Sequence, residues 1–500
     1  MEPGSKSHPL DQQFWNRANS LFQKEKYSKL IELINKSGTT WIQDSNLVLI
    51  YAQALRKSEQ SKMAFEVLSS ALALHSLKAE LWAELGYCLT ELNDIRKALE
   101  AFVKAGQIDQ QNAEIKLQIG LCHFKLGNDL RAINLFLDVL NLNQKSSLAW
   151  LNLGNAFVRT RDISAAIEAF SMIYEDDVNY PMARFNRSLC DLLKGEFETG
   201  WTDYEWRRKI KGSEYQKLNL PLRQWDGQSK GDEKIFISSE QGIGDEVFFA
   251  RWLRYLSTFK SHFTVAIDER LIPLYSRSFS NITFVSKMVK SQITNFDAYI
   301  PIGSLPLLLK KYTDCGTSYL IQDQNRSDKL RQKINPDNQF VVGISWISKN
   351  SGSGIFRSVQ LNQMLSLFEN LDLKIISLQY GDSGTEFAAL AQKDQRLDIA
   401  PFVDKFGDVD SLASLISACD LVVSVDNSTV HFSGALGKKT FVMLNHAPDW
   451  RWGLNDQTTN WYASHRLFRQ TQAHSWEKPL TEVKLALEEH TKNSGRTLKQ

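Results

Sequence analysis

Residues 420–437, DLVVSVDNSTVHFSGALG, combine an apolar run with polar side chains that follow it directly. The run predicts a buried strand, and Asp426, Asn427 and Ser428 then end it with side chains that favour the start of a helix. This helix is expected to end at Gly437. In an open parallel sheet, ligands bind beyond the carboxyl ends of the strands, where helix N-termini point. The segment therefore predicts a ligand site, and the alternative is an ordinary capped helix after a core strand.

The polar residues of this segment suggest which ligand it would bind. Free backbone N–H groups at Ser428 and Thr429 could hold a phosphate, assisted by the helix dipole. Asp426 and Asn427 stand where their side chains could meet hydroxyls of a sugar or a ribose. His431 lies one turn into the predicted helix and could face the same cleft.

A second candidate turn, residues 241–245 with the sequence QGIGD, follows a predicted strand over 234–239. It lacks the third glycine of a dinucleotide fingerprint and the lysine of a P-loop, so nicotinamide chemistry and ATP hydrolysis both fit poorly. Gly242 and Gly244 would let the backbone approach a ligand closely. Asp245 is expected to cap the next helix and to point at the cleft, where it could act as a general base. The alternative is that Asp245 only caps the helix.

Two further strand ends carry candidate binding residues. Trp346 and Lys349 lie at the end of one predicted strand, and Arg357 lies in the Gly- and Ser-rich loop that follows. Either cation could neutralise a diphosphate, and the alternative is a solvated surface loop. Gln379, the first residue of the segment 379–381, closes another strand and could contact a nucleobase or a ribose.

Composition narrows the class of protein. The chain has 500 residues and a net charge of +2, which suggest about three domains and argue against a nucleic-acid-coating surface. The five cysteines form no C-x-x-C pair, so we expect a reduced, cytoplasmic setting without structural zinc. Cys88, Cys122 and Cys190 fall in helical patterns and are expected in the core. We see no apolar leader at the N-terminus and no run of membrane-spanning length.

The elements before residue 209 follow an internal repeat of 34 residues. Small residues recur at one position, Gly86, Gly120, Gly154 and Ser188, and at a second, Ala98, Ala132, Ala166 and Gly200. Aromatic residues recur at a third position, Phe102, Phe136, Phe170 and Tyr204. The small residues would let two antiparallel helices approach closely, and the aromatic rings would fill the gap between pairs. Such units bury their apolar faces only by stacking.

This pattern resembles the tetratricopeptide repeat, in about six units over residues 12–208. The resemblance implies a concave groove that holds a peptide or protein segment, and the alternative is a scaffold or oligomerisation surface without a groove ligand. The last unit keeps Trp201, Tyr204 and Trp206 where a capping repeat becomes polar, so we expect it to pack on the next domain. Residues 209–232 are expected to form a connection.

Strands alternate with helices in the rest of the chain, which predicts parallel sheets with right-handed crossovers. We expect two Rossmann-like halves, residues 233–324 and 340–490, joined by a hinge over 325–339, with a cleft between the halves. The predicted strands cover 234–239, 263–268, 282–286 and 297–301 in the first half, and 340–346, 373–379, 421–425, 439–444 and 467–470 in the second.

Five segments, taken in order, resemble the bacterial proteins that join tetratricopeptide repeats to a heptosyltransferase-type glycosyltransferase. They are QGIGDEVFFARWL, GISW with the later K and RSVQL, ISLQ, DLVVSVDNSTVHFSGALGK and PDWRWGL. The resemblance implies a GT-B fold, an α-solenoid followed by two Rossmann-like halves, and metal-independent sugar transfer. It assigns the base to Asp245 and the loop lysine to Lys349. It assigns donor phosphate and sugar binding to Asp426, Ser428, Thr429 and His431.

The expected function is therefore an inverting glycosyltransferase with a nucleotide-sugar donor, no cofactor and no metal, since no D-x-D motif stands beside the predicted cleft. Flagellin glycosyltransferases are a closer analogy than the lipopolysaccharide enzymes, because the repeats offer a groove for a protein acceptor. Asn427 replaces a common threonine, and the donor stays open. The alternatives are a repeat scaffold with a degenerate transferase domain, and a transferase that acts on a glycan or lipid core.

Overall fold

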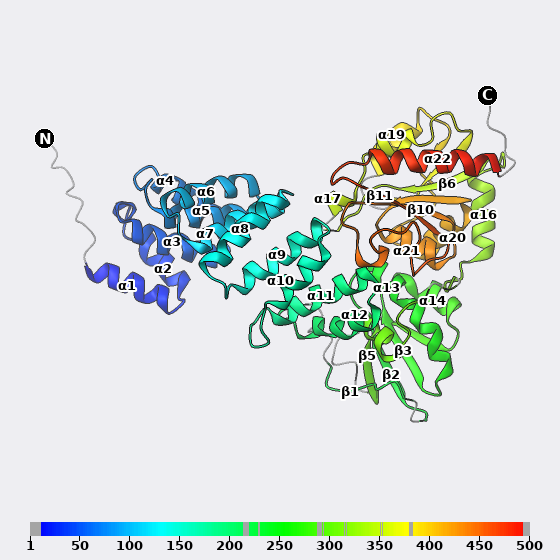
Figure 1. The fold of residues 1–500 in the computed structure, drawn as a ribbon, viewed down its shortest axis with the longest axis horizontal. Coiled ribbons are helices and arrows are strands. Elements are labelled where there is room, and N and C mark those ends of the chain that lie inside the picture. Colours follow the sequence, from blue (N-terminus) through cyan, green and yellow to red (C-terminus); the bar gives the residue numbers. More distant parts are fainter. Residues whose placement is uncertain are drawn as a thin grey trace. The chain divides into compact units, whose positions relative to one another are not determined.

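The structure is a computed structural model that describes residues 12–213, 220–228, 231–287, 293, 295–314, 316, 318–350, 352, 354–379 and 384–493. The chain divides into two compact units, Met1–Tyr180 and Pro181–Gln500 (Figure 1). No helix in the described ranges is long and apolar enough to cross a membrane.

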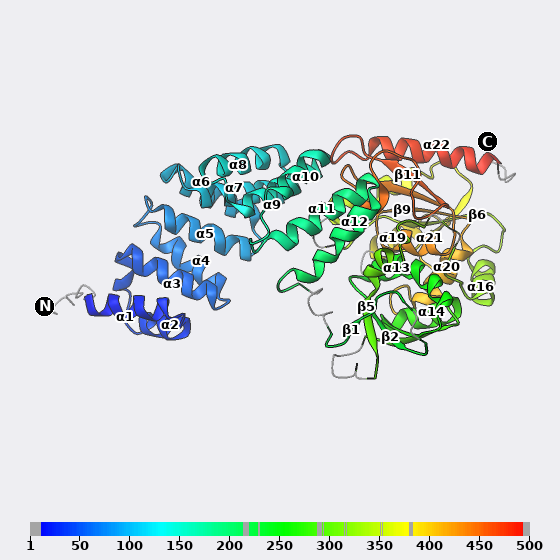
Figure 2. The same ribbon diagram turned by 60° about the horizontal axis from the view of Figure 1, so that its bottom comes forward.

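The first unit consists of helices in successive antiparallel pairs (Figure 2). They are α1 (Gln12–Gln23), α2 (Tyr27–Asn35), the 3-10 helix η1 (Thr40–Gln43), α3 (Ser45–Lys57), α4 (Ser61–Ala71), α5 (Ala79–Glu91), α6 (Ile95–Ile108), α7 (Ala113–Lys125), α8 (Asp129–Leu142), α9 (Ser147–Arg159) and α10 (Ile163–Ser171). Cys88 and Cys122 are buried on helices of this unit, as predicted.

The glycine and phenylalanine positions of the repeat meet within a pair. A Cβ added to Gly86 of α5 would lie 2.7 Å from the ring of Phe102 on α6, its partner helix. The same relation joins Gly154 to Phe170, at 2.4 Å. Each ring therefore sits on the glycine of its own pair, and Phe102 also belongs to a core cluster that includes Cys122 of the next pair. Only glycine leaves room for the ring there.

The next pair, α11 (Tyr180–Lys194) and α12 (Phe197–Tyr204), continues the repeat register but is counted, from Pro181 on, with the second unit. Trp201 of α12 is fully buried, and its ring meets those of Trp252 and Trp450 edge-on at 5.7 and 5.3 Å. These partners belong to the α/β part of the chain. The prediction that this aromatic pair packs on the next domain is confirmed.

The first sheet of the second unit has five parallel strands in the order β1-β5-β2-β3-β4. They are β1 (Arg223–Gln224), β2 (Lys234–Ser238), β3 (His262–Ile267), β4 (Ile282–Ser286) and β5 (Ala298–Pro301). Its helical segments are η2 (Glu205–Lys209), α13 (Ile243–Phe249), η4 (Ala250–Thr258), η5 (Glu269–Leu271), α14 (Ile272–Ser278), η7 (Ile302–Ser304) and α15 (Leu305–Leu308).

The second sheet has six parallel strands in the order β11-β10-β9-β6-β7-β8. They are β6 (Phe340–Ser345), β7 (Leu373–Ser377), β8 (Leu397–Asp398), β9 (Leu421–Val425), β10 (Thr440–Leu444) and β11 (His465–Arg469). This is the order of a doubly wound sheet, in which the direction of winding reverses between β6 and β9. The loops after these two strands therefore meet at the point where such sheets hold ligands.

Helices cover this sheet, since its strands β6 and β9 are largely apolar and are buried at every position. They are α16 (Gln324–Ile334), α17 (Gly354–Arg357), α18 (Leu361–Ser366), α19 (Gly384–Ala391), α20 (Val409–Ala418), α21 (Ser428–Ala435), η8 (Trp450–Trp452) and α22 (Glu477–Asn493). Figure 1 shows α22 lying along one face of the sheet, where Val483 and Leu487 join the core.

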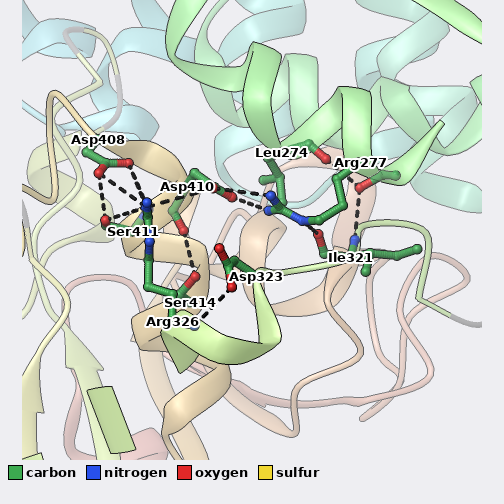
Figure 3. Close-up of polar contacts among 10 residues, drawn as sticks. Leu274, Arg277, Ile321, Asp323, Arg326, Asp408, Asp410, Ser411 and Ser414 are labelled. Atoms are coloured by element: carbon green, nitrogen blue, oxygen red, sulfur yellow. Dashed lines mark hydrogen bonds and ion pairs between the residues drawn. The ribbon is translucent and has the colours of Figure 1, made fainter. Parts of the chain in front are cut away.

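The segment predicted as a hinge forms α16, whose start is capped by Asp323. Figure 3 shows the charged contacts around it. Arg277 of α14, on the first sheet, pairs with the buried Asp410 of α20, on the second sheet, and its Nε donates to the carbonyl of Ile321 at 2.8 Å. Arg326 of α16 reaches Asp408 at 3.3 Å. The contacts of Arg277 join the first sheet to the second beside α16.

Candidate functional site

Asn427 joins the two loops at the reversal point of the second sheet. It is the N-cap of α21, and its Oδ1 accepts the N–H of Thr429 at 2.9 Å. Its Nδ2 donates to Oγ of Ser345 at 2.8 Å and to the carbonyl of Ile347 at 3.1 Å, in the loop after β6. The expected free N–H at Thr429 is therefore wrong, since Asn427 already takes it. Both amide protons of Asn427 are likewise used inside the protein.

Gln379 fixes the loop after β6 by hydrogen bonds. Its Oε1 accepts hydrogen bonds from Oγ of Ser345 and from the backbone N–H groups of Trp346 and Ile347, at 3.0 to 3.1 Å. Trp346 is buried and stacks on Phe387 with ring centroids 5.7 Å apart. Both residues lie in the interior beneath the loop. The neighbours Tyr380 and Gly381 lie outside the described residues.

The turn after β2 brings the first sheet to the same place. Gln241 has φ of 61°, a left-handed backbone that is rare for a residue with a side chain, and its Nε2 donates to Oη of Tyr204 at 3.0 Å. A Cβ added to Gly244 would lie 3.3 Å from Cα of Ser428 and from Cδ2 of His431. Glycine at this position lets the start of α13 close onto the start of α21.

These loops enclose a cleft of about 440 Å³ within the second unit. Every residue that the sequence predicts for the site lines the cleft except Trp346, Gln379 and Thr429, which are buried beneath it. Gly242, Gly244 and Asp245 line it from the first sheet. The predicted residues of the second sheet that line it are Lys349, Arg357, Asp426, Asn427, Ser428 and His431.

Sequence reasoning missed several lining residues. Asp449 is the residue before η8, and Arg451 belongs to η8. Both follow β10, where the only sequence signal was the PDWRWGL segment. Phe185 and Leu189 come from α11, and Tyr204 from α12. The helical pair at the end of the repeats therefore supplies an apolar wall of the cleft.

Five charged side chains alternate in sign along the cleft. Oδ1 of Asp245 lies 2.6 Å from Nη2 of Arg451, whose Nη1 lies 2.9 Å from Oδ1 of Asp449. Arg357 reaches Asp449 at 3.7 Å and Oδ2 of Asp426 at 2.9 Å. The two guanidinium groups are thus compensated by three carboxylates.

Lys349 stands apart from this chain of charges. Its side chain is exposed at the rim of the cleft, and it has no acidic partner in the described part of the chain. Of the cations predicted for this site, it is therefore the one whose charge other side chains leave uncompensated.

The surroundings shift the pKa values of the three carboxylates in different directions. Burial raises the pKa of Asp245, with Arg451 opposing the rise, and 27 % of its side chain remains exposed to water. Burial also raises the pKa of Asp426 against the charge of Arg357. For Asp449 burial acts in the same direction, but Arg451 and Arg357 outweigh it and hold the pKa below its ordinary value. Asp245 and Asp426 therefore hold a proton more readily than Asp449 does.

Asp245 also has a structural task. It is the third residue of α13, and its Oδ2 accepts the N–H of Gly242 at 3.3 Å. It therefore caps the helix from inside the first turn, as a reach-back contact, while its other oxygen faces Arg451. Within the described residues, no group of three or more His, Cys, Asp or Glu side chains is arranged to hold a metal ion.

The fold and the comparison with protein families define the class of the first unit. The tetratricopeptide repeat family matches residues 79–112, which contain α5 and α6. The first unit is a helical solenoid of tetratricopeptide type, a class of scaffold for protein interaction, and the second unit holds the parallel α/β sheets.

The chain is similar to "Protein FlbA" of Caulobacter vibrioides, at 26% identity over 461 residues, which covers 87% of this chain and 71% of FlbA. Among solved structures it is similar to PilF of Pseudomonas aeruginosa, at 16% identity and a TM-score of 0.36, over 41% of this chain and 95% of that one. It is also similar to the C-terminal part of a tetratricopeptide-repeat protein of Cytophaga hutchinsonii, at 16% identity and a TM-score of 0.34, over 39% of this chain and 78% of that one.

Proposed function

We propose that this chain is an inverting glycosyltransferase of the GT-B type, which moves a sugar from a nucleotide-sugar donor to a protein acceptor. One observation carries the proposal. The reversal point of a doubly wound sheet opens on a cleft that Asp245, Lys349 and Ser428 line together, from two sheets. This is where α/β sheets hold nucleotide ligands.

The donor would bind against the second sheet. Its diphosphate would lie at the start of α21, beside Ser428, where the helix dipole favours negative charge. Arg357 and Arg451 are already compensated by carboxylates, so Lys349 would supply the positive charge that offsets the diphosphate. The exposure of Lys349 in the lining of the cleft supports this role.

The acceptor would reach the cleft along the helical pair at the end of the repeats. In the repeat register, Phe185 and Leu189 of α11 take the positions of Leu151 and Asn155 in the preceding repeat. They line the cleft together with Tyr204. A protein segment that binds this face of α11 would therefore stand beside Asp245.

Asp245, Lys349 and the start of α21 would supply the protein groups for the transfer step. The acceptor hydroxyl gives its proton to Asp245 as its oxygen forms a bond to the anomeric carbon. The bond from that carbon to the diphosphate breaks, and the electron pair leaves with the nucleoside diphosphate. Attack opposite the leaving group inverts the anomeric centre. Lys349 and the start of α21 stabilise the charge that develops on the diphosphate.

The test is a panel of nucleotide sugars, measured with the full chain by thermal shift and by calorimetry. A true donor raises the melting temperature, because it binds the folded state. Lys349→Ala should weaken that donor about tenfold or more, since it removes a charged contact. Ser428→Trp should block binding. Lys329→Ala on α16, an exposed lysine outside the cleft, is the matched control and should leave the affinity unchanged.

The second candidate function is a repeat scaffold whose α/β unit has lost transferase activity. The tetratricopeptide match and the compensated charges of the cleft favour it. It would be preferred if no nucleotide sugar stabilised the protein. Mass spectrometry of a co-expressed candidate acceptor tests the last part of the proposal, because sugar found on a glycan or a lipid core instead of a protein would contradict a protein acceptor.

A further inference from the structure

The ring of His431 is held by aromatic neighbours at the floor of the cleft. It stacks on Trp452 with an interplanar angle of 14° and centroids 5.6 Å apart. Phe248 of α13 meets it edge-on at 5.9 Å. Only 7 % of the residue is exposed. The ring cannot turn over without displacing these neighbours, so each of its nitrogens has fixed surroundings.

The two edges of the ring face different surroundings. Nδ1 lies 3.0 Å from Oη of Tyr462. The opposite edge, which carries Cδ2 and Nε2, faces Gly244, where an added Cβ would lie 3.3 Å from Cδ2. Gly244 and His431 both line the cleft. Since Tyr462 occupies Nδ1, Nε2 is the ring nitrogen left for a ligand in the cleft.

Tyr462 is fixed as firmly as His431. Its ring lies against the backbone of α21 at Gly434, where an added Cβ would come within 2.2 Å of the ring. Gly434 follows His431 by three residues, so both lie on one face of the helix. The close packing at Gly434 therefore sets the position of the Tyr462 hydroxyl beside Nδ1.

The protons on this edge can be assigned from their partners. Burial raises the pKa of Tyr462, so its phenol keeps its proton. The nearby phenol of Tyr319 donates its own proton to the carbonyl of Val247 at 2.9 Å. An unprotonated imidazole nitrogen is a good acceptor and a phenol a good donor. Tyr319 is a second hydrogen-bond partner of the Tyr462 hydroxyl, but its phenol oxygen is a much weaker acceptor than an imidazole nitrogen. The Tyr462 hydroxyl then donates to Nδ1, and the proton of the neutral ring resides on Nε2.

We propose that Tyr462 is a positioning residue that holds His431 in its Nε2–H form, so that His431 offers a hydrogen-bond donor to the cleft and no base. This rests on the proposed function for its ligand, which would be an oxygen of the donor diphosphate. The groups that face the ring from the packed elements are Arg451, Asp449, Arg251 and His465. Burial lowers the pKa of His431 well below its ordinary value, and both arginines act in the same direction. The imidazole of His431 is then a neutral hydrogen-bond donor and stays neutral across the physiological pH range.

The test is ¹⁵N spectroscopy of the full chain labelled at histidine, with the His431 signals identified from their loss in His431→Gln. We expect one protonated nitrogen, coupled strongly to both ring C–H protons, which marks it as Nε2. In Tyr462→Phe the signals should shift toward a mixture of the two tautomers. Tyr275→Phe is the matched control, because Tyr275 is also buried and its hydroxyl has no hydrogen-bond partner among the described residues. It should leave His431 unchanged.

A proton on Nδ1 in the wild-type chain, as would follow if Tyr462 donated to Tyr319, overturns the proposal. An unchanged spectrum in Tyr462→Phe overturns the role of Tyr462. The wild-type measurement decides the tautomer even if that variant does not fold. Titration with inorganic pyrophosphate and with uridine and guanosine diphosphates should shift the Nε2 signal, and Tyr462→Phe should bind about tenfold more weakly. If none of these binds while the tautomer is as expected, the proposed function fails and the positioning role stands.

Discussion

The buried guanidinium of Arg207 forms a bidentate ion pair with Glu240, with Nε–Oε2 and Nη2–Oε1 distances of 2.7 and 2.8 Å. Arg207 belongs to η2, directly after α12, and Glu240 follows β2. Glu240 also accepts the N–H of Gly303, which follows β5, at 2.7 Å. The first sheet reverses its winding between β2 and β5, so Arg207 fills the place where such a sheet would hold a ligand. The helical pair is thereby locked to the turn that carries Gln241 and Asp245.

The first prediction concerns this ion pair. Arg207→Met should lower the free energy of unfolding of the second unit by about 3–5 kcal/mol, because it leaves the Glu240 carboxylate buried without its partner. Chemical denaturation followed by tryptophan fluorescence measures it. Arg223→Met removes the partially exposed ion pair with Glu233 and should cost about 1 kcal/mol or less. Equal losses in the two variants would show that the Arg207 pair contributes no more than a surface pair.

The second prediction concerns Asp245. Asp245→Asn keeps an oxygen that can accept the N–H of Gly242, and it removes the proton acceptor. Donor affinity and melting temperature should stay near those of wild type, and turnover should fall by roughly two to four powers of ten. Asp268→Asn is the matched control, since Asp268 caps η5 at the same edge of the sheet and does not line the cleft. Near-normal turnover of Asp245→Asn would remove Asp245 from the chemistry.

The third prediction concerns pH. A base acts after it has lost its proton, so turnover should fall as the pH drops through the pKa of Asp245. Burial raises this pKa, so the midpoint of the acidic limb of the pH–rate profile should lie above the ordinary aspartate pKa of about 3.9. Arg451 opposes the rise, and Arg451→Met should therefore move the limb to still higher pH.

Rate profiles for wild type and Arg451→Met test the sign of this effect. Arg254→Met serves as the control, because Arg254 pairs with Asp314 outside the cleft. It should leave the limb where it is. A limb that moves to lower pH in Arg451→Met would contradict the assignment of the base to Asp245.

The sequence predicts local features of this site well, because neighbouring residues in the chain determine them. The strand β9 and the helix α21 follow from one apolar run and the polar residues after it, and Gly244 follows from its turn. The contact between Arg451 and Asp245 joins residues 206 positions apart, and no local pattern encodes it. Gln379 shows a second limit, since a glutamine that ties a loop and one that holds a ligand look alike at a strand end. The two-residue strands β1 and β8 carry no periodic pattern at all.

The last prediction concerns where the repeats can be cut from the transferase unit. The sequence suggests removing everything before about residue 233, but that cut would take away Arg207 and Trp201. A chain of residues 181–500 keeps both, and it should bind the nucleotide sugar about as tightly as the full chain while losing modification of the protein acceptor. A chain of residues 233–500 should unfold or aggregate, because the Glu240 carboxylate and the rings of Trp252 and Trp450 lose their buried partners. Melting temperature, donor affinity and acceptor modification are measured on the three chains in parallel. Full acceptor modification by residues 181–500 would show that the first unit does not hold the acceptor, and a stable 233–500 chain that binds the donor would show that the helical pair is dispensable to the cleft.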